Sequence, residues 1–269
     1  MNNLEKFRAL GISECVIAAL QQKGFEEPSP IQELTIPLLL KGEKDVIGQA
    51  QTGTGKTAAF GIPIIDTITR GSGNPQALIL SPTRELSIQI AEELNSLKGA
   101  SPLRIAPFYG GQFIGVQLKK LEEGIDIVIG TPGRIIDLME RGKLVLDELQ
   151  FAVLDEADEM LDMGFVDDIK QILAATPGDK RMLMFSATMP KEILAIAEQF
   201  MRPDYEIIRT RTESVSTDLT EQIYYEIRRE NKLEAISRII DMEDALELGI
   251  IGFSDLENVI APVAGKLAI

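Results

Sequence analysis

Short apolar segments alternate with longer amphipathic ones along most of this 269-residue chain, and no other feature constrains the possible folds as strongly. Several of the short segments are apolar on both faces, which indicates strands buried on both sides. Strands that alternate with helices build a parallel sheet covered by helices. We therefore predict an α/β fold with an open, mostly parallel sheet and helices on both faces. The expected strands are Asp45–Gln49, Ala77–Leu80, Arg104–Tyr109, Ile125–Ile129, Phe151–Leu154, Met182–Phe185 and Glu206–Ile208, and the helices between them are Thr57–Arg70, Glu85–Leu97, Gly115–Glu123, Arg134–Glu140 and Lys191–Met201.

The N-terminal part of the chain is predicted to hold two further helices ahead of the first strand. Ser13 can cap the first of them, which ends at Gly24. Ser29 with Pro30 can start the second, which ends at Gly42. These helices would form a lead-in to the sheet.

The C-terminal part of the chain changes character after the last expected strand. Residues 210–220 are polar and lack apolar periodicity, which predicts a linker. Gln222–Ile227 is then typical of one strand and Lys232–Ile240 of one amphipathic helix. The final 28 residues, 16 of them apolar, match no pattern. The expected organisation is a lead-in at residues 1–44, a main α/β domain at 45–209, a linker at 210–220, the start of a second domain at 221–241 and an unassigned tail at 242–269.

The composition excludes several kinds of site. With 27 basic and 42 acidic residues the net charge is −15, so any contact with nucleic-acid phosphates must be local. A single cysteine, Cys15, allows no internal disulfide. The sequence has no histidine, which excludes a zinc site of the usual type and catalysis by Ser-His or Cys-His pairs. No stretch approaches the roughly 20 apolar residues that span a bilayer, so we expect a cytoplasmic protein without membrane contact.

A glycine-rich segment joins the first expected strand to the following helix, a context typical of a phosphate-binding loop. Glycines let backbone N–H groups turn toward phosphate oxygens, and the helix N-terminus adds partial positive charge. Lys56 can reach the outer phosphates, and the Thr57 hydroxyl can bind Mg²⁺. A turn that merely connects strand to helix is the alternative interpretation. The segment consists of Ala50, which replaces the usual first glycine, Gln51, Thr52, Gly53, Thr54, Gly55, Lys56 and Thr57.

Two carboxylates follow the apolar run Phe151–Leu154, where open α/β sheets bind ligands. Asp155 is expected to hold Mg²⁺, directly or through water, and Glu156 to orient and deprotonate the attacking water. The alternative is that these acidic side chains only cap the next helix and interact with its dipole.

Together with five more segments, these two motifs resemble the DEAD-box ATP-dependent RNA helicases, which are ATPases built from two RecA-like domains. The tetrapeptide Asp155–Asp158 spells the name of the family. The resemblance covers about Leu4 to Met242. It implies a first RecA-like domain of the P-loop NTPase type and a truncated second one. The five segments are Gly24–Gln32 with Phe7 ahead of it, Pro82–Leu86, Gly110–Gly111, Thr131–Arg134 and Ser186–Thr188.

The resemblance implies that the bound nucleotide is ATP, with Mg²⁺ as cofactor. It implies Lys56 and Glu156 as catalytic residues. The side-chain amide of Gln32 carries a donor and an acceptor in one plane, as needed to match the edge of adenine. Phe25 or Phe7 can pack on the ring. The alternative for Gln32 is an ordinary surface position on a helix.

For RNA, the resemblance implies contacts with phosphates and 2′-hydroxyls and therefore little sequence preference. A surface salt bridge is the alternative for each arginine. Asp158, Ser186 and Thr188 are expected to couple hydrolysis to strand separation, although Ser186 and Thr188 can also be ordinary strand-end hydroxyls. The expected RNA contacts are Pro82, Thr83, Arg84, Gly111, Thr131, Gly133 and Arg134.

The resemblance fails in the second domain. The family's histidine-led, arginine-rich motif has no counterpart, because beyond Arg211 the only arginines are Arg228, Arg229 and Arg238. We therefore expect the nucleotide-binding half of a helicase with low ATPase activity, and a partner or second domain that supplies arginine fingers. One alternative is a non-catalytic ATP- and RNA-binding module that acts through a partner. Another, a small-molecule phosphoryl transferase, leaves the segments Gly24–Gln32 and Pro82–Leu86 unexplained.

Overall fold

The computed structural model describes residues 4–42, 44–51, 53–71 and 73–210, together with residues 231, 234–235 and 237–238. The chain separates into two units, Met1–Glu213 and Ser214–Ile269, and nearly all of the described residues belong to the first. Nearly all of the predicted linker, the predicted start of a second domain and the whole of the predicted tail lie outside the described residues. Within the described part of the chain, no helix is long and apolar enough to cross a membrane.

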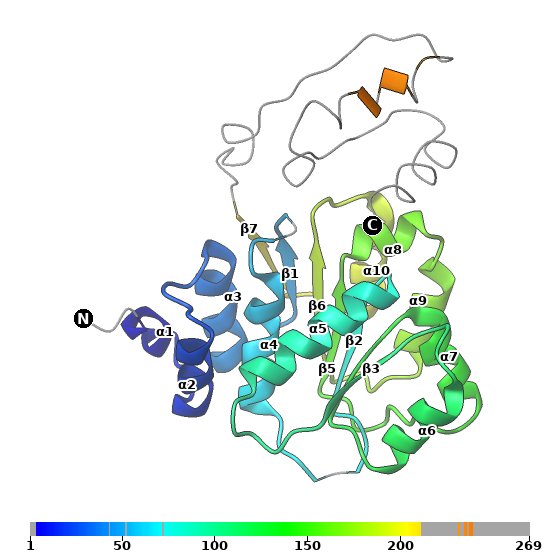
Figure 1. Cartoon of the computed structure of the whole chain (residues 1–269), viewed down its shortest axis with the longest axis horizontal. Helices are drawn as coiled ribbons and strands as arrows, with labels where there is room; N and C mark the ends of the chain where they lie inside the picture. Colours follow the sequence, from blue (N-terminus) through cyan, green and yellow to red (C-terminus); the bar gives the residue numbers. More distant parts are fainter. Residues whose placement is uncertain are drawn as a thin grey trace. The chain divides into compact units, whose positions relative to one another are not determined.

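The core of the first unit is a seven-stranded sheet in the order β3-β4-β2-β5-β6-β1-β7. Every pair of neighbouring strands is parallel, which confirms the predicted open parallel sheet (Figure 1). All carboxyl ends of the strands therefore meet at one edge, called here the carboxyl edge. The strands are β1 (Val46–Gln49), β2 (Ala77–Leu80), β3 (Ile105–Phe108), β4 (Ile127–Gly130), β5 (Phe151–Asp155), β6 (Arg181–Ser186) and β7 (Glu206–Arg209).

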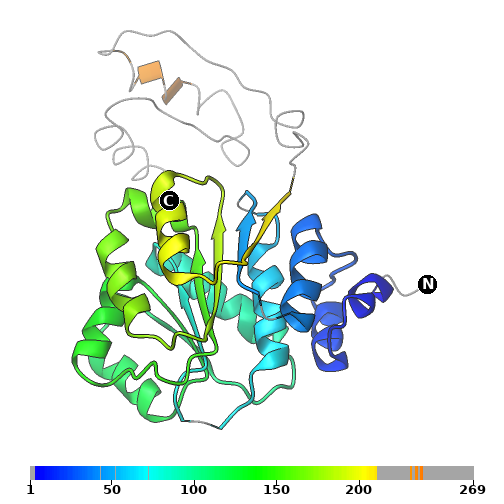
Figure 2. The same ribbon diagram turned by 180° about the vertical axis from the view of Figure 1, so that it is seen from behind.

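Two hydrophobic clusters pack against the two faces of the sheet. In β2, Ala77 and Ile79 belong to one cluster, and Leu78 and Leu80 to the other, as the alternation of strand side chains requires. In Figure 1, α5 crosses in front of the strands, whereas Figure 2 shows α10 in front when the molecule is seen from behind. The first cluster includes side chains of α1 (Glu5–Ala9), α2 (Glu14–Gln22), α3 (Pro30–Lys41), α4 (Lys56–Thr67) and α5 (Arg84–Leu97); the second is covered by α6 (Ile114–Glu122), α7 (Pro132–Glu140), α8 (Ala157–Asp162), α9 (Val166–Ala174) and α10 (Lys191–Phe200).

The seven strands and seven helices predicted within the described residues all form, with ends shifted by at most a few positions. The Ser13 side chain accepts a hydrogen bond from the Val16 N–H and so caps α2 as predicted. The sequence reading missed the helices Glu5–Ala9, Ala157–Asp162 and Val166–Ala174. The first two have five and six residues, too few for helical periodicity to be visible, and they form through tertiary packing.

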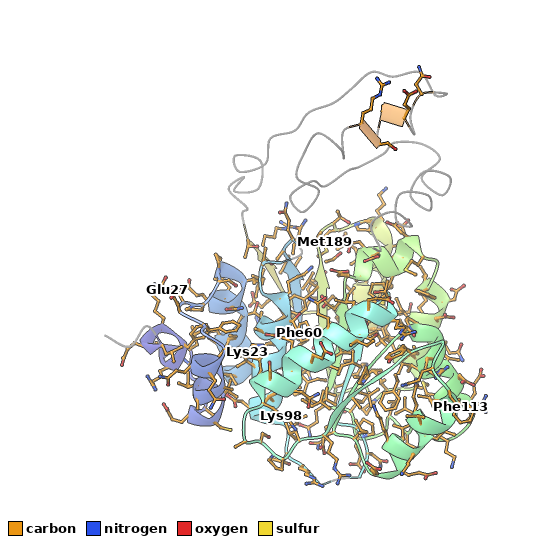
Figure 3. All side chains as sticks on the ribbon, in the orientation of Figure 1. Lys23, Glu27, Phe60, Lys98, Phe113 and Met189 are labelled. Carbon is orange, nitrogen blue, oxygen red and sulfur yellow. The ribbon has the colours of Figure 1, made fainter. Side chains whose placement is uncertain are left out.

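Figure 3 shows the side chains of the described residues on the ribbon, and buried hydrophobic clusters lie on both faces of the sheet. The labelled Phe60 of α4 lies in the interior and packs on Phe185 of β6, with ring centroids 5.2 Å apart. Phe113, at the start of α6, lies at the margin of the molecule and is 78% exposed. The contact between Phe60 and Phe185 thus packs α4, the helix after β1, against β6.

Candidate functional site

The glycine-rich segment forms a tight turn between β1 and α4. Gly53 and Gly55 have φ values of +81° and +87°, which side-chain-bearing residues rarely adopt. The Thr54 hydroxyl donates a hydrogen bond to the Gln51 carbonyl at 2.7 Å and closes the turn. Thr52 lies outside the described residues. The turn leads directly into the N-terminus of α4, as a phosphate-binding loop requires.

The first helical residue, Lys56, is 6% exposed, and its ammonium nitrogen has no hydrogen-bond partner among the described residues. A desolvated cation without a hydrogen-bonded partner is costly in free energy. An anion in the turn would remove that cost. The orphaned Lys56 ammonium thus fits the phosphate groups of a nucleotide.

Asp155 is the last residue of β5 and is 2% exposed. Burial raises the pKa of the Asp155 carboxyl to about 7; the positive charge of Lys56 lowers this pKa, and the negative charge of Glu156 raises it further. Besides Lys56, the backbone N–H of Glu156 stabilises the ionised form, with a hydrogen bond of 3.1 Å to Asp155 Oδ1. A bound cation would stabilise this carboxylate, so the donor set of Asp155 with the Thr57 hydroxyl fits Mg²⁺.

Glu156 is the single described residue other than glycine with a positive φ, 53°. Such backbone strain persists only where the surroundings impose it, and it occurs often in active sites. Glu156 precedes α8, but its side chain makes no capping hydrogen bond. Glu156 thus occupies the N-cap position of α8 without capping it through its side chain, and its alternative role as a partner of the helix dipole stays open.

A pocket of about 220 Å³ opens beside these residues. Glu159 and Asp162 were not predicted, although they follow Glu156 at helical spacings of three residues. A hydrogen bond with Glu156 raises the pKa of Glu159, and burial and nearby negative charges add to the effect. The pocket is lined by Lys56, Glu156, Asp158, Glu159, Asp162 and Ala187.

The residues predicted to read adenine lie next to the turn. Gln32 is 3% exposed; its Nε2 donates to the Gly55 carbonyl at 3.1 Å and its Oε1 accepts from the Ser29 N–H at 3.0 Å. A side chain on Gly55 would collide with the Gln32 amide. Phe25 is half-buried, whereas Phe7 is completely buried and meets it edge to face at 6.1 Å. Of the two rings, Phe25 alone has surface for direct contact with a ligand, and Phe7 supports it.

The predicted coupling residues form one hydrogen-bonded group across the ends of β5 and β6. Asp158 Oδ2 accepts hydrogen bonds from the Thr188 N–H and hydroxyl, both at 2.8 Å. The Asp158 N–H donates to the Ser186 hydroxyl at 3.3 Å. Burial raises the pKa of Asp158, but hydrogen bonds with Ser186 and Thr188 outweigh it and hold the pKa below its usual value. Ser186 and Thr188 are thus tied to Asp158 and are not isolated strand-end hydroxyls.

The predicted RNA contacts lie at the carboxyl ends of β2 and β3. Pro82 is buried, and Thr83 caps α5 by accepting a hydrogen bond from the Leu86 N–H at 3.2 Å. Arg84 is exposed and stacks over the Tyr109 ring at 5.0 Å. Gly111 is exposed and has a φ of +83°. An exposed arginine, a helix N-terminus and an open glycine backbone therefore adjoin one another.

Beyond β4, Thr131 stands at the N-cap of α7, and Gly133 is exposed in its first turn. The Arg134 side chain is only 13% exposed and binds Gln117, the Gln112 carbonyl and Asp137. The Arg134 side chain is therefore bound by other residues of the protein and does not point freely into solvent. The sequence reading missed Gln112 and Gln117.

The sheet order brings the predicted residues together in two groups along the carboxyl edge. The phosphate-loop, carboxylate and coupling residues follow β1, β5 and β6, which are the half of the sheet next to β7, and Gln32 of α3 joins them through its hydrogen bond to the Gly55 carbonyl. The predicted RNA contacts follow β2, β3 and β4, the other half. Because β2 and β5 are neighbours, the two groups adjoin at the middle of the sheet.

Comparisons with known proteins find several similar chains. The chain is 49% identical over 239 residues to the ATP-dependent RNA helicase CshA of Limosilactobacillus reuteri, covering 89% of this chain and 48% of that protein. It is 48% identical over 238 residues to the RNA helicase CrhR of Synechocystis sp., covering 88% of this chain and 48% of that protein. The chain thus spans about half the length of these relatives.

A solved structure is also similar to this chain. The crystal structure of a DEAD box protein from the hyperthermophile Methanococcus jannaschii matches 97% of this chain and 70% of its own, with a TM-score of 0.74 and 41% identity. The family model described as DEAD/DEAH box helicase matches residues 29–196, more than half of the chain. The chain therefore belongs to the DEAD/DEAH box helicase family.

Proposed function

We propose that this chain is the nucleotide-binding half of an ATP-dependent RNA helicase, in which ATP binding and hydrolysis are coupled to RNA binding and unwinding. The observation that carries the proposal is the buried Lys56 ammonium, which has no hydrogen-bond partner among the described residues and stands at the N-terminus of α4. An anionic ligand is the natural partner for a cation in that position.

In the proposed ATP complex, the backbone from Ala50 to Thr57 surrounds the phosphates and Lys56 donates to the outer ones. Gln32 reads adenine, and Phe25 packs on its ring. The hydrogen bond from Gln32 to the Gly55 carbonyl supports a second role for Gln32, because it links the adenine side of the site to the phosphate loop. Replacing Gln32 by Ala is therefore expected to weaken ATP strongly and GTP to a lesser degree.

For hydrolysis, the Thr57 hydroxyl and the Asp155 carboxylate would hold Mg²⁺, which when bound neutralises charge on the phosphates. Glu156 orients and deprotonates the attacking water. Its strained backbone and its position on the pocket wall support this role. The hydrogen bond between Glu156 and Glu159 supports Glu159 as a group that holds the Glu156 carboxyl in place.

RNA is proposed to bind along the carboxyl ends of β2, β3 and β4. Arg84 and the backbone N–H groups at Gly111, at Thr83 and at the start of α7 would contact phosphates and sugars, so little sequence preference is expected. Pro82, Thr131, Gly133 and Arg134 shape this surface. The Asp158–Ser186–Thr188 group is proposed to couple ATP hydrolysis to the separation of RNA strands.

A second domain or a partner chain is proposed to supply the arginine fingers that the transferring phosphate requires. A cytoplasmic location belongs to the same proposal, because ATP and RNA are both available there. Without those arginines we expect the 269-residue chain to hydrolyse ATP slowly and not to separate duplex RNA.

The test of nucleotide binding is Lys56→Met, with Lys180→Met as matched control. Lys180 is also 6% exposed, but it lies ahead of the amino end of β6 and donates to the Pro177 carbonyl. Loss of a charge-assisted hydrogen bond should weaken Mg-ATP by about tenfold to a hundredfold in Lys56→Met, measured by calorimetry. The Lys180→Met variant should bind as the unaltered chain does. Equal affinity in both variants would contradict the proposal.

A second experiment separates the helicase from the alternative of a non-catalytic module. ATP turnover is measured with and without RNA, first for the chain alone and then for the chain joined to a second helicase domain. RNA-stimulated turnover in the joined protein supports the helicase. ATP and RNA binding without turnover in either protein would favour the non-catalytic module.

A further inference from the structure

Helix α6 fully buries a single side chain, and that side chain is polar. Gln117 has no exposed surface, whereas the apolar residues Ile114, Leu118 and Leu121 of the same helix are only partly buried. A buried amide is costly unless each of its polar atoms is hydrogen-bonded. The burial of Gln117 in place of an apolar residue therefore calls for a physical reason.

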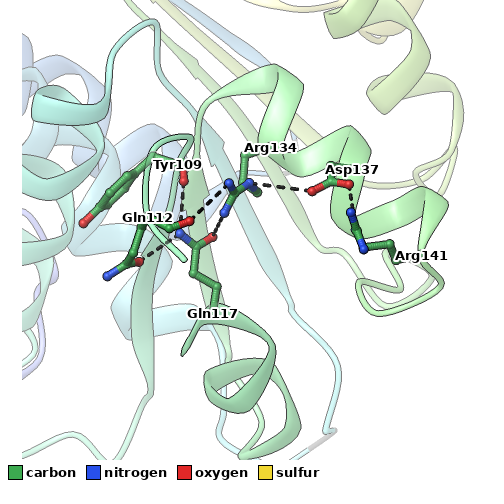
Figure 4. Close-up of polar contacts among 6 residues, drawn as sticks. All are labelled: Tyr109, Gln112, Gln117, Arg134, Asp137 and Arg141. Atoms are coloured by element: carbon green, nitrogen blue, oxygen red, sulfur yellow. Dashed lines mark hydrogen bonds and ion pairs between the residues drawn. The ribbon is translucent and has the colours of Figure 1, made fainter. Parts of the chain in front are cut away.

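The Gln117 amide uses both of its polar atoms (Figure 4). Its Nε2 donates to the Tyr109 carbonyl at 3.0 Å and to Gln112 Oε1 at 2.9 Å, and its Oε1 accepts from Arg134 Nη1 at 2.9 Å. This orientation is chemically fixed, because a backbone carbonyl can only accept and a guanidinium can only donate.

These bonds join two segments that are separate in the chain. Tyr109 and Gln112 belong to the turn after β3, and Arg134 belongs to the first turn of α7, after β4. Arg134 adds a bond of 3.5 Å to the Gln112 carbonyl and an ion pair of 3.8 Å with Asp137. Asp137 also binds Arg141 at 2.7 Å (Figure 4). The result is a continuous network from the turn after β3 along α7.

We propose that Gln117 is a positioning residue for RNA: it fixes the turn at Tyr109–Gln112 relative to the start of α7, so that the backbone at Gly111 and the N-terminus of α7 meet neighbouring phosphates of one strand. This inference rests on the proposed RNA-binding function. It assigns Arg134 chiefly to the same network, which agrees with its low exposure.

The chemistry of the network explains why a glutamine is needed at position 117. Two donors and one acceptor must reach three partners from one side chain. Glutamate keeps the acceptor for Arg134 but loses both donors, and methionine keeps the shape but loses all three bonds. Two contact segments held rigidly before binding lose less conformational entropy when RNA binds, which raises affinity.

The test uses Gln117→Met and Gln117→Glu in the 269-residue chain, with Gln76→Met as matched control. Gln76 is also buried and hydrogen-bonded, to Thr69 and Gln150, but it lies at the amino end of β2. Affinity for single-stranded RNA is measured by fluorescence anisotropy, and Mg-ATP affinity by calorimetry. Hydrogen exchange reports on the segments 109–113 and 131–134.

In Gln117→Met we expect RNA affinity to fall about tenfold while Mg-ATP affinity stays within about twofold. Exchange should rise together in the two segments and stay unchanged in β5 and β6. Gln117→Glu should show a smaller loss, because its bond to Arg134 remains. Gln76→Met should keep both affinities.

Wild-type RNA affinity in Gln117→Met would overturn the inference, as would an equal loss of RNA and ATP affinity, since the latter indicates general destabilisation. If the unaltered chain binds no RNA, the proposed RNA function fails instead. Hydrogen exchange then decides about the network alone: a joint increase in the two segments supports the positioning role, and unchanged exchange overturns it.

Discussion

The two edges of the sheet bury polar side chains in opposite ways. At the amino edge, where the strands begin, Asp45 accepts hydrogen bonds from the N–H groups of Met182 and Arg202 at 2.9 and 2.8 Å. Asp126 likewise accepts from the Arg104 N–H at 2.7 Å. These carboxylates replace backbone partners and tie loops together, as buried polar groups in a stable core do.

At the carboxyl edge, burial leaves polar groups in costly states. The Lys56 ammonium has no hydrogen-bond partner within the described part of the chain, and burial raises the pKa of Asp155 to about 7. Next to Asp155, the half-buried Glu156 has a strained backbone with a φ of 53°. Buried carboxylates therefore stabilise the fold at the amino edge, whereas the buried charges of Lys56 and Asp155 prepare a ligand site at the carboxyl edge. Substitutions at the two edges test this contrast.

The largest effect is expected for Glu156→Gln. Loss of the general base should reduce ATP turnover by about 10² to 10⁴-fold, measured in the chain joined to a second helicase domain, while Mg-ATP affinity is retained. Asp45→Asn, at the amino edge, should keep the turnover of each folded molecule. Normal turnover in Glu156→Gln would show that another residue is the base.

The next largest effect is expected for Asp45→Ala. One buried and one half-buried backbone N–H group lose their acceptor, so the free energy of unfolding should fall by about 3 kcal/mol, measured by urea denaturation. Mg-ATP affinity of the folded protein should not change. A loss below about 1 kcal/mol would contradict the proposed difference between the two edges, because Asp45 would then contribute little to stability.

Asp155→Asn is expected to change stability in the other direction. In metal-free buffer at pH 8 the variant should gain roughly 2 kcal/mol of unfolding free energy, because it removes a buried carboxylate, while it loses Mg²⁺-dependent ATP affinity. The pKa of Asp155 in the folded state is raised from 3.8 to about 7. Asp155 therefore contributes stability to the unaltered chain that is fully present below pH 3.8 and is lost as the pH rises through 7. The advantage of the variant should therefore shrink as pH falls from 7 toward 4. A pH-independent difference would contradict the proposed cause.

The smallest effect on stability is expected for Thr188→Val. It removes one exposed hydrogen bond to Asp158, so the unfolding free energy should change by less than about 1 kcal/mol. Thr176→Val, which removes a hydroxyl bond to the Leu173 carbonyl ahead of β6, should have a similar effect. In the chain joined to a second domain, strand displacement should fall in Thr188→Val alone. Equal displacement by both variants would remove Thr188 from the coupling group.

The amino-acid sequence was sufficient to predict the strands, most of the helices and the chemistry at the strand ends. Alternating apolar segments predicted all seven strands of the described sheet, because burial on both faces leaves a local pattern. The turn at Gly53 and Gly55 was also predictable, since glycine is the residue that adopts its φ values without strain. The carboxyl group of Asp155 at a strand end followed from the apolar run that precedes it.

Which of these groups contact one another depends on the tertiary fold. Gln32 reaches Gly55 across 23 residues, Asp158 reaches Thr188 across 30, and Gln117 reaches Arg134 across 17. The burial of Phe7 beneath Phe25 depends in the same way on how α1 packs. Periodicity records which face of an element is buried, but it contains no information about partners on other elements. Those partners are set by the strand order and by the packing of helices on the sheet. For this reason the hydrogen-bond partners of Gln117, which lies among apolar residues of α6, could be identified only from the fold.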